Sequence, residues 1–293
     1  MPNWVTNHLT IEAETEERLH EIMTAIAYDD KGLGTIDFNK INPMPPELDI
    51  ESGTKTKQAL ERYTHFIRAA QLTGCVGLQE PLPMSIEDER VKLISPNYEK
   101  DADLIAFGAK AYSNKQKYGA TDWYYWCSSN QPGHWGTKWN STPMDDPHEY
   151  DGSNRLEFQT AWSPPEPVIV RLSEMYPDAQ FRHRWADEDI GMNVGEITYQ
   201  EGEAIEYDVP SGGSKEAYEM AAEIIGIDLS EYELYYSQTK GSYVNREDLA
   251  WEDMCYRAKK TREDFAQKTR AGRSRGPGRE ASAKSIQKRG QNG

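Results

Sequence analysis

The sequence predicts a mixed α+β protein in which helices cover one face of an antiparallel sheet, arranged as a split βαβ sandwich. Two observations predict this class. A strand–helix–strand pattern occurs near the N-terminus and again between residues 156 and 199. The long crossover pattern that a parallel sheet needs is not seen around either copy.

The first copy begins with residues 4–11, where apolar and polar residues alternate as in a half-buried strand. Thr15 suits a helix N-cap, and residues 19–26 place apolar side chains at helical spacing. Residues 35–41 predict a second strand. The proline-rich residues 42–46 end it, because proline cannot donate to a sheet ladder.

A mainly helical insertion follows. Apolar residues at 60–67 share one helical face, with Gly74 as a stop signal, and residues 104–112 predict another helix that ends before Gly119. Residues 80–100 are rich in proline and acidic residues, so we expect a connecting loop there.

The second copy begins with a strand at residues 156–162, where Trp162 falls on the same side as the inward residues. Ser163 stands where a helix N-cap is expected, before two prolines and a glutamate. Residues 180–185 and 194–199 predict two further strands.

The C-terminal third predicts a helix that stops near Gly226, a short aromatic strand at 231–237 and a helix from 245 to about 270. Residues 272–293 are rich in Gly, Ser, Arg and Lys, which is typical of disorder. The predicted domains are a core of residues 1–45 and 120–210, a helical insertion of 46–119, a helical extension of 211–271 and a disordered basic tail of 272–293.

Charge limits the classes of partner. The chain has 33 Lys and Arg against 49 Asp and Glu, a net of −16. Residues 256–293 contain 12 basic and 3 acidic residues, a net of +9, which leaves −25 for the rest. An acidic body repels phosphate, so only the tail is expected to contact nucleic acid. The body favours a protein partner with a basic surface.

The sequence predicts a cytoplasmic protein without a membrane segment. No apolar run approaches the roughly 18 residues that a membrane span needs, and the N-terminus does not resemble a secretory signal. Cys75, Cys127 and Cys255 are far apart and lack metal-ligand spacing, so we expect free thiols in a reducing compartment.

The densest candidate site is an aromatic block at residues 123–140. Its indoles suit a platform that stacks a nucleobase or a peptide side chain, with polar anchors beside it and a glycine that allows close backbone approach. The alternative is that the tryptophans seal an edge of the sheet. The candidates are Trp126, Trp135, Gly136, Lys138, Trp139 and Asn140.

Asp187 and Glu188 form a second candidate, at the end of a predicted strand. They present paired carboxylates to a basic partner, or one of them caps the turn.

A metal site is the third possibility, built from His148, Asp151, His183 and Asp187. Such residues hold metals that activate water. However, no fixed-spacing motif is present, an acidic loop is expected in a chain of this charge, and His183 alternates with aromatic residues as a hydrogen-bonded sheet histidine does. We therefore predict no metal, no cofactor and no catalytic residue. Activation of the Cys127 thiol has no support in its neighbours, and no phosphate-binding loop occurs.

Five segments in order resemble the YubB ferredoxin-like domain family and cover about half of the chain: MPNWVTNHLTI, FNKINPMPPEL, HWGTKWN, FQTAWSPPEPVIVRLSEMYP and FRHRWADEDIGMNVGEI. The resemblance implies a ferredoxin-like α+β sandwich carried by phages and plasmids, and hence the bacterial cytoplasm. It implies no catalytic residues. "Ferredoxin-like" describes topology, because three scattered cysteines cannot supply the four thiolates of most iron–sulfur clusters.

Three functional hypotheses follow. The leading one is a non-enzymatic accessory protein that binds a macromolecular partner; the resemblance implies a role in host takeover or counter-defence. The first alternative is a nucleotide-type small-ligand binder that uses the Trp126, Trp135 and Trp139 platform with Lys138. The second is a metal-dependent hydrolase.

Overall fold

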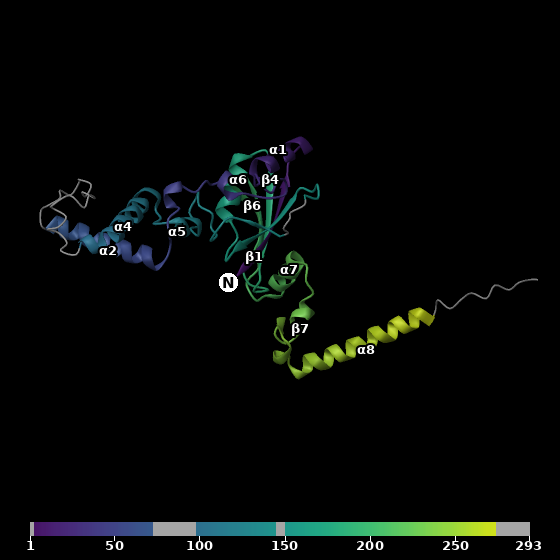
Figure 1. The fold of residues 1–293 in the computed structure, drawn as a ribbon. Helices are drawn as coiled ribbons and strands as arrows, with labels where there is room; N and C mark the ends of the chain where they lie inside the picture. Colours follow the sequence, from purple (N-terminus) through teal and green to yellow (C-terminus); the bar gives the residue numbers. More distant parts are fainter. Residues whose placement is uncertain (1–2, 73–97, 145–149, 274–293) are drawn as a thin grey trace, which may run out of the picture. The chain divides into compact units, whose positions relative to one another are not determined.

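The computed structural model describes residues 3–72, 98–144 and 150–273 (Figure 1). The chain divides into two compact units, Met1–Tyr232 and Glu233–Gly293.

The first unit is built on a six-stranded sheet in the order β2-β3-β1-β4-β5-β6, and every neighbouring pair is antiparallel. β1 lies between β3 and β4, so β3, α6 and β4 form a split βαβ unit around it. The strands are β1 (Trp4–Glu12), β2 (Thr142–Pro143), β3 (Arg155–Ala161), β4 (Gln180–Asp187), β5 (Val194–Gln200) and β6 (Glu203–Asp208).

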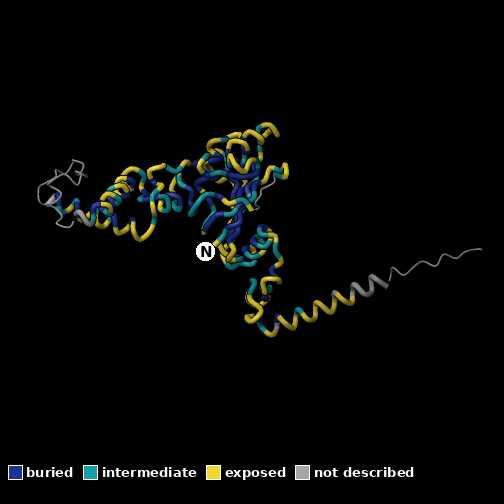
Figure 2. Tube along the Cα trace, viewed as in Figure 1, coloured by how far each residue is buried: buried dark blue, intermediate teal, exposed yellow. Residues whose placement is uncertain are grey.

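The main core lies on one face of this sheet. β1 contributes Val5, Leu9 and Ile11, all fully buried, and α1 (Glu16–Ile26) and α6 (Glu166–Met175) cover them. Figure 2 shows this buried interior as dark blue tube within the sheet region. Thr15 caps α1 as predicted, because its side chain accepts the Arg18 N–H. The predicted α+β class, with two helices on one face, is confirmed.

A further helix, α7 (Lys215–Ile225), packs on the opposite face. Ala217 and Ala221 lie against Ala186 of β4 and Val194 of β5. The helix ends at Gly226, as predicted, in a left-handed C-cap with φ 76°.

The strand predicted at residues 35–41 is wrong. The segment instead contains a 3-10 turn, η1 (Phe38–Lys40). The Asp37 carboxylate accepts the Asn39 N–H, and the Asn140 side-chain oxygen accepts the Phe38 N–H at 2.9 Å. Side chains therefore satisfy backbone groups that a strand would pair in a ladder. The alternation in the sequence reflects burial of single apolar residues.

Two predictions at the end of β3 also need correction. Trp162 does not continue the inward row: it has φ 74° and is 42% exposed. Ser163 does not cap α6, whose N-cap is Pro165 without a side-chain hydrogen bond. The Ser163 hydroxyl donates instead to the Gly136 carbonyl at 2.6 Å, which explains its position.

The predicted helices of the insertion are confirmed as α2 (Thr54–Leu72) and α4 (Tyr98–Tyr118), which pack against each other through Phe66 and Ile105. A Cβ on Gly108 would overlap the Ala59 carbonyl, so the two backbones approach closely. A 3-10 turn, η2 (Pro46–Leu48), precedes α2, and the short α5 (Trp123–Cys127) follows α4. Gly74 and most of the predicted loop at 80–100 lie outside the described residues.

The first unit ends with η3 (Leu229–Tyr232). The second contains a hairpin of β7 (Leu234–Ser237) and β8 (Ser242–Asn245), then η4 (Arg246–Asp248) and α8 (Trp251–Arg273). The predicted aromatic strand corresponds to β7, and the predicted long helix to η4 and α8. The tail beyond residue 273 lies outside the described residues, and the predicted domain limits stay predictions. Across the described ranges, the helices are too short or too polar to cross a membrane.

Candidate functional site

Two of the predicted platform indoles lie inside the core. Trp126 and Trp135 are 5% and 4% exposed, and their rings pack edge to face at 5.6 Å. The Trp135 indole N–H donates to the Asn42 carbonyl at 2.8 Å. Both side chains are therefore closed to a ligand, which fits the sealing role that the sequence left open.

Gly136 and Asn140 hold the loop around these indoles. Gly136 has φ 74°, and a Cβ there would stand 2.7 Å from Cδ of Pro167. The Asn140 side chain bonds to Phe38 and donates to the Asp37 carboxylate at 2.6 Å. Both residues fasten the loop to α6 and to residues 37–38, and neither faces a ligand.

Lys138 and Trp139 belong to a different, half-exposed cluster at one end of the sheet. The Lys138 ammonium lies 4.5 Å from the ring centres of both Trp139 and Trp162. Trp4 packs 6.0 Å from Trp139, and Tyr124 packs 6.0 Å from Trp162. We call these five residues, Trp4, Tyr124, Lys138, Trp139 and Trp162, the aromatic rim.

The rim is assembled by strand ends. Trp4 opens β1 and pairs with Ala161, the last residue of β3. Trp162 follows directly, and its backbone N–H donates to the Asn3 carbonyl at 2.8 Å. The left-handed backbone at Trp162 costs about 1–2 kcal/mol for an L-residue. This turn presents the indole outward beside Lys138.

Asp187 and Glu188 lie at the same end of the sheet. The Glu188 N–H donates to the Trp4 carbonyl at 2.9 Å, and the Glu188 side chain is exposed. Asp187 is buried and accepts the Asp189 N–H and the Asn193 side-chain amide. Asp187 therefore orders the turn, while Glu188 supplies charge next to the rim.

The predicted metal ligands do not come together. His183 and Asp187 are four residues apart in β4, so their Cα atoms are separated by about 13 Å. Asp151 is exposed and bonds to Ser153, and His148 lies outside the described residues. Within the described part of the chain, no group of three or more His, Cys, Asp or Glu is placed to hold a metal ion.

His183 is instead a buried sheet histidine. Its Nε2 lies 3.0 Å from the Asn7 side-chain oxygen, and Asn7 in turn donates to the Thr160 hydroxyl at 2.9 Å. Burial lowers the pKa of His183 to about 3, so the ring is neutral near pH 7. Its Nδ1 and the indole Nε1 of the neighbouring Trp185 are buried and find no hydrogen-bond partner among the described residues.

The Cys127 thiol does not fit a nucleophile. It is buried with its sulfur 3.8 Å from the Met44 sulfur, and burial raises its pKa to about 12. A thiolate is the reactive form, so this environment suppresses reactivity.

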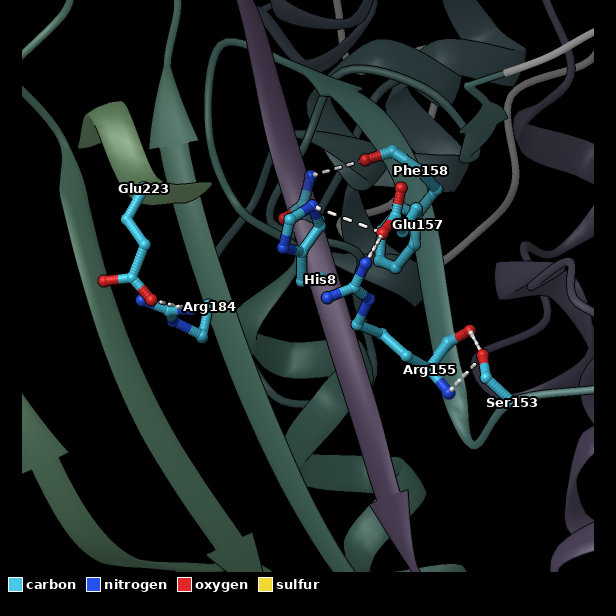
Figure 3. Close-up of polar contacts among 8 residues, drawn as sticks. His8, Ser153, Arg155, Glu157, Phe158, Arg184 and Glu223 are labelled. Atoms are coloured by element: carbon cyan, nitrogen blue, oxygen red, sulfur yellow. Dashed lines mark hydrogen bonds and ion pairs between the residues drawn. The ribbon is translucent and has the colours of Figure 1, made fainter. Parts of the chain in front are cut away.

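A polar network on the face of the sheet opposite the main core escaped the sequence analysis (Figure 3). Arg184 lies 2.8 Å from Glu196 and 3.1 Å from Glu223 of α7. His8 lies 3.9 Å from Glu157, and its pKa is lowered mainly by burial, against the attraction of Glu157. Arg184 pairs with carboxylates of β5 and α7, and His8 of β1 faces Glu157 of β3, so we assign this network to holding the strands and α7 together. The polar positions of the strand alternation were the signal for it.

The part of the chain that carries β2 to β6, α6 and α7 also has the clearest likeness to known proteins. Residues 134–228 match a family model. Its description is "Ferredoxin-like domain in Api92-like protein". This ferredoxin-like domain contains every predicted site residue except Trp126. The YubB resemblance itself stays a prediction.

A crystal structure of the protein Api92 from Yersinia pseudotuberculosis shows a weak likeness to the chain. It is 10% identical, covers 72% of this chain and 99% of its own, and has a TM-score of 0.28. Among curated proteins, none matches the chain.

Proposed function

We propose that the first unit is a binding module that engages a protein partner with a basic surface through the aromatic rim and the adjacent Glu188. The observation that carries the proposal is the presentation of Trp162. Its indole is 42% exposed, which leaves apolar area in water, and its backbone is left-handed, which is unfavourable for an L-residue. Both features lower the stability of the fold. Unfavourable features of this kind are retained at surfaces that take part in binding.

The composition of the rim supports a protein partner. Trp and Tyr are enriched among the residues that dominate protein–protein binding energies. The Lys138 ammonium lies 4.5 Å from the ring centres of both indoles, and contacts of this kind restrain the rings before binding, which reduces the side-chain entropy lost on association. The rim therefore offers rigid anchors.

The charge of the unit supports a basic partner. Residues 233–293 contain 14 Lys and Arg and 8 Asp and Glu, a net of +6, which leaves −22 for residues 1–232. Glu188 and Asp189 are exposed on the turn beside Trp4. A field of this sign steers basic proteins and repels nucleic acid.

The small-ligand alternative loses its basis, because Trp126 and Trp135 of its platform are buried. The hydrolase alternative has no observation in its favour among the described residues. A role in host takeover or counter-defence, implied by the YubB resemblance, belongs to the same proposal, and the identity of the partner would test it.

The experiment is affinity capture from a bacterial extract with the tagged full chain, its Trp162→Asn variant and a matched Tyr207→Ala control. Asparagine tolerates a left-handed backbone, so the first variant removes the indole with little strain. Tyr207 is 71% exposed on β6 and lies outside the rim.

We expect the wild type and the control to retain the same basic protein, with retention falling as salt rises. Trp162→Asn should lose it while its thermal unfolding stays close to that of the wild type. Capture of acidic proteins alone, or equal capture by Trp162→Asn, would contradict the proposal.

A further inference from the structure

The second unit contains a cleft between its hairpin and α8. The cleft has a volume of about 470 Å³ and is lined from the hairpin by Tyr235 and Tyr236 and from the helix by Asp253, Tyr256, Arg257 and Lys260. The helix residues recur at three- and four-residue spacing, so they share one helical face. Figure 1 shows β7 beside the start of α8.

Two cations open into this cleft. The Arg257 guanidinium lies 4.4 Å from the ring centre of Tyr235, so it stacks on the ring and keeps its charge available. Lys260 is exposed one helical turn further on. Neither Lys260 nor its neighbours Lys259 and Arg262 has an ion-pair partner among the residues that the structure describes.

Aromatic faces stand beside those cations. Tyr256 is 53% exposed between Asp253 and Lys260 on the cleft face of α8. Tyr235 and Tyr236 come from β7, and Tyr236 packs 5.6 Å from Tyr243 of β8. The sequence places the basic segment and the hairpin tyrosines about twenty residues apart, and the fold brings them together.

The one carboxylate of the cleft is already engaged. Asp253 is 2% exposed and accepts hydrogen bonds from the Ser237 hydroxyl at 2.6 Å, the Gln238 N–H at 2.8 Å and the Thr239 hydroxyl at 3.1 Å. These donors hold the pKa of Asp253 below its usual range. Asp253 thus ties the hairpin turn to α8 and leaves the open side of the cleft basic.

We infer that this cleft binds single-stranded nucleic acid, with the tyrosines stacking on bases and Arg257 and Lys260 contacting phosphates. Cations next to flat aromatic faces are the combination that single-strand sites use. The net charge of the unit, +6, complements a polyanion. An acidic peptide would use the cations alone, and duplex bases would not expose faces for the rings.

The inference concerns the second unit and does not depend on the function proposed for the first. The experiment measures fluorescence anisotropy of a labelled oligothymidylate of about ten nucleotides, within the usual range of single-strand site sizes, against the full chain. Duplex DNA of the same length and polyglutamate serve as competitors.

We expect Tyr256→Leu to weaken binding about ten-fold, because stacking on one base is lost. Lys260→Gln should lower the slope of log affinity against log salt by about 0.7, the value for one phosphate of a single strand. Lys259→Gln is the matched control: it removes the same charge from the same helix at a position that does not line the cleft.

Circular dichroism of each variant checks that α8 is retained. The inference is overturned if Tyr256→Leu binds like the wild type, if Lys259→Gln and Lys260→Gln have equal effects, or if duplex or polyglutamate competes as well as the single strand. Absence of measurable binding by the wild type would overturn it as well.

Discussion

At Gly136, both the backbone conformation and the packing of its neighbours require a residue without a Cβ. Its φ of 74° is in the left-handed region, and the position of a Cβ falls 2.7 Å from Pro167 of α6. Gly133 has a similar φ of 83° but nothing within 4 Å of its Cβ position. The two glycines therefore separate conformational strain from steric overlap.

We expect Gly133→Ala to lower the free energy of unfolding by about 1–2 kcal/mol, the cost of a left-handed L-residue. Gly136→Ala should lower the free energy of unfolding by the same amount and by about 1–3 kcal/mol more, because the added Cβ is overpacked against Pro167. Urea denaturation of both variants measures the difference. Equal losses would mean that the loop yields and that Gly136 is needed for its conformation alone.

The buried His183 should make the free energy of unfolding decrease at acidic pH. Its folded pKa, about 3, is lower than the unfolded value of about 6.5, so the unfolded chain takes up a proton first as pH falls. This group therefore has little effect on stability well above pH 6.5, and its contribution decreases stability progressively as the pH falls through that value. At pH 5 the expected loss is about 2 kcal/mol relative to pH 7.

His183→Gln should remove most of that loss, although the variant is less stable at pH 7 because the bond to Asn7 changes. His20→Gln, at an exposed position of α1, is the control and should keep the wild-type pH dependence. Urea denaturation midpoints of the three proteins at pH 7 and pH 5 measure the acid-dependent loss. An unchanged acid loss in His183→Gln would assign it to other groups.

At the scale of elements, the pair formed by α2 and α4 depends on close backbone approach at Gly108. Alanine normally stabilises a helix interior by about 1 kcal/mol over glycine. Here the added Cβ would overlap the Ala59 carbonyl, so the helices must separate. We expect Gly108→Ala to be destabilising. The sign of the change in the unfolding free energy is the test, and stabilisation would show that the two helices can move apart freely.

In the six-stranded sheet, the long strands with a buried row of residues could be predicted from the sequence, whereas the exposed β6 could not. β1, β3, β4 and β5 bury alternate residues, so their period is visible. β6 is exposed at all six positions and shows no contrast between its faces. Residues 35–41 alternate for a different reason. The Asn140 and Asp37 side chains accept the backbone N–H groups of Phe38 and Asn39, so the segment forms a turn in which single apolar side chains are buried.

The sequence predicted the types of residue in the candidate site, but it could not predict which individual residues form it. Local sequence cannot distinguish the sealed Trp135 from the half-exposed Trp139, four residues later. The rim also needs Trp4 and Trp162, which are brought to the same end of the sheet because β1 pairs with β3. Long-range strand pairing determines which indoles reach the surface.

At the scale of the whole molecule, the two proposed sites belong to units of opposite charge, −22 and +6, and share no residue. Effects of substitutions at sites without shared partners are usually additive. We therefore expect Trp162→Asn to abolish protein capture and leave oligothymidylate affinity within about two-fold of the wild type, a difference of less than about 0.5 kcal/mol. Tyr256→Leu should weaken oligothymidylate binding about ten-fold and leave protein capture unchanged. The double variant should show both losses, each as large as in the single variant. The measurements are capture yield and anisotropy on the same four proteins. A fall in oligothymidylate affinity in Trp162→Asn would mean that the rim takes part in nucleic-acid binding, and the assignment of separate tasks to the two units would then be wrong.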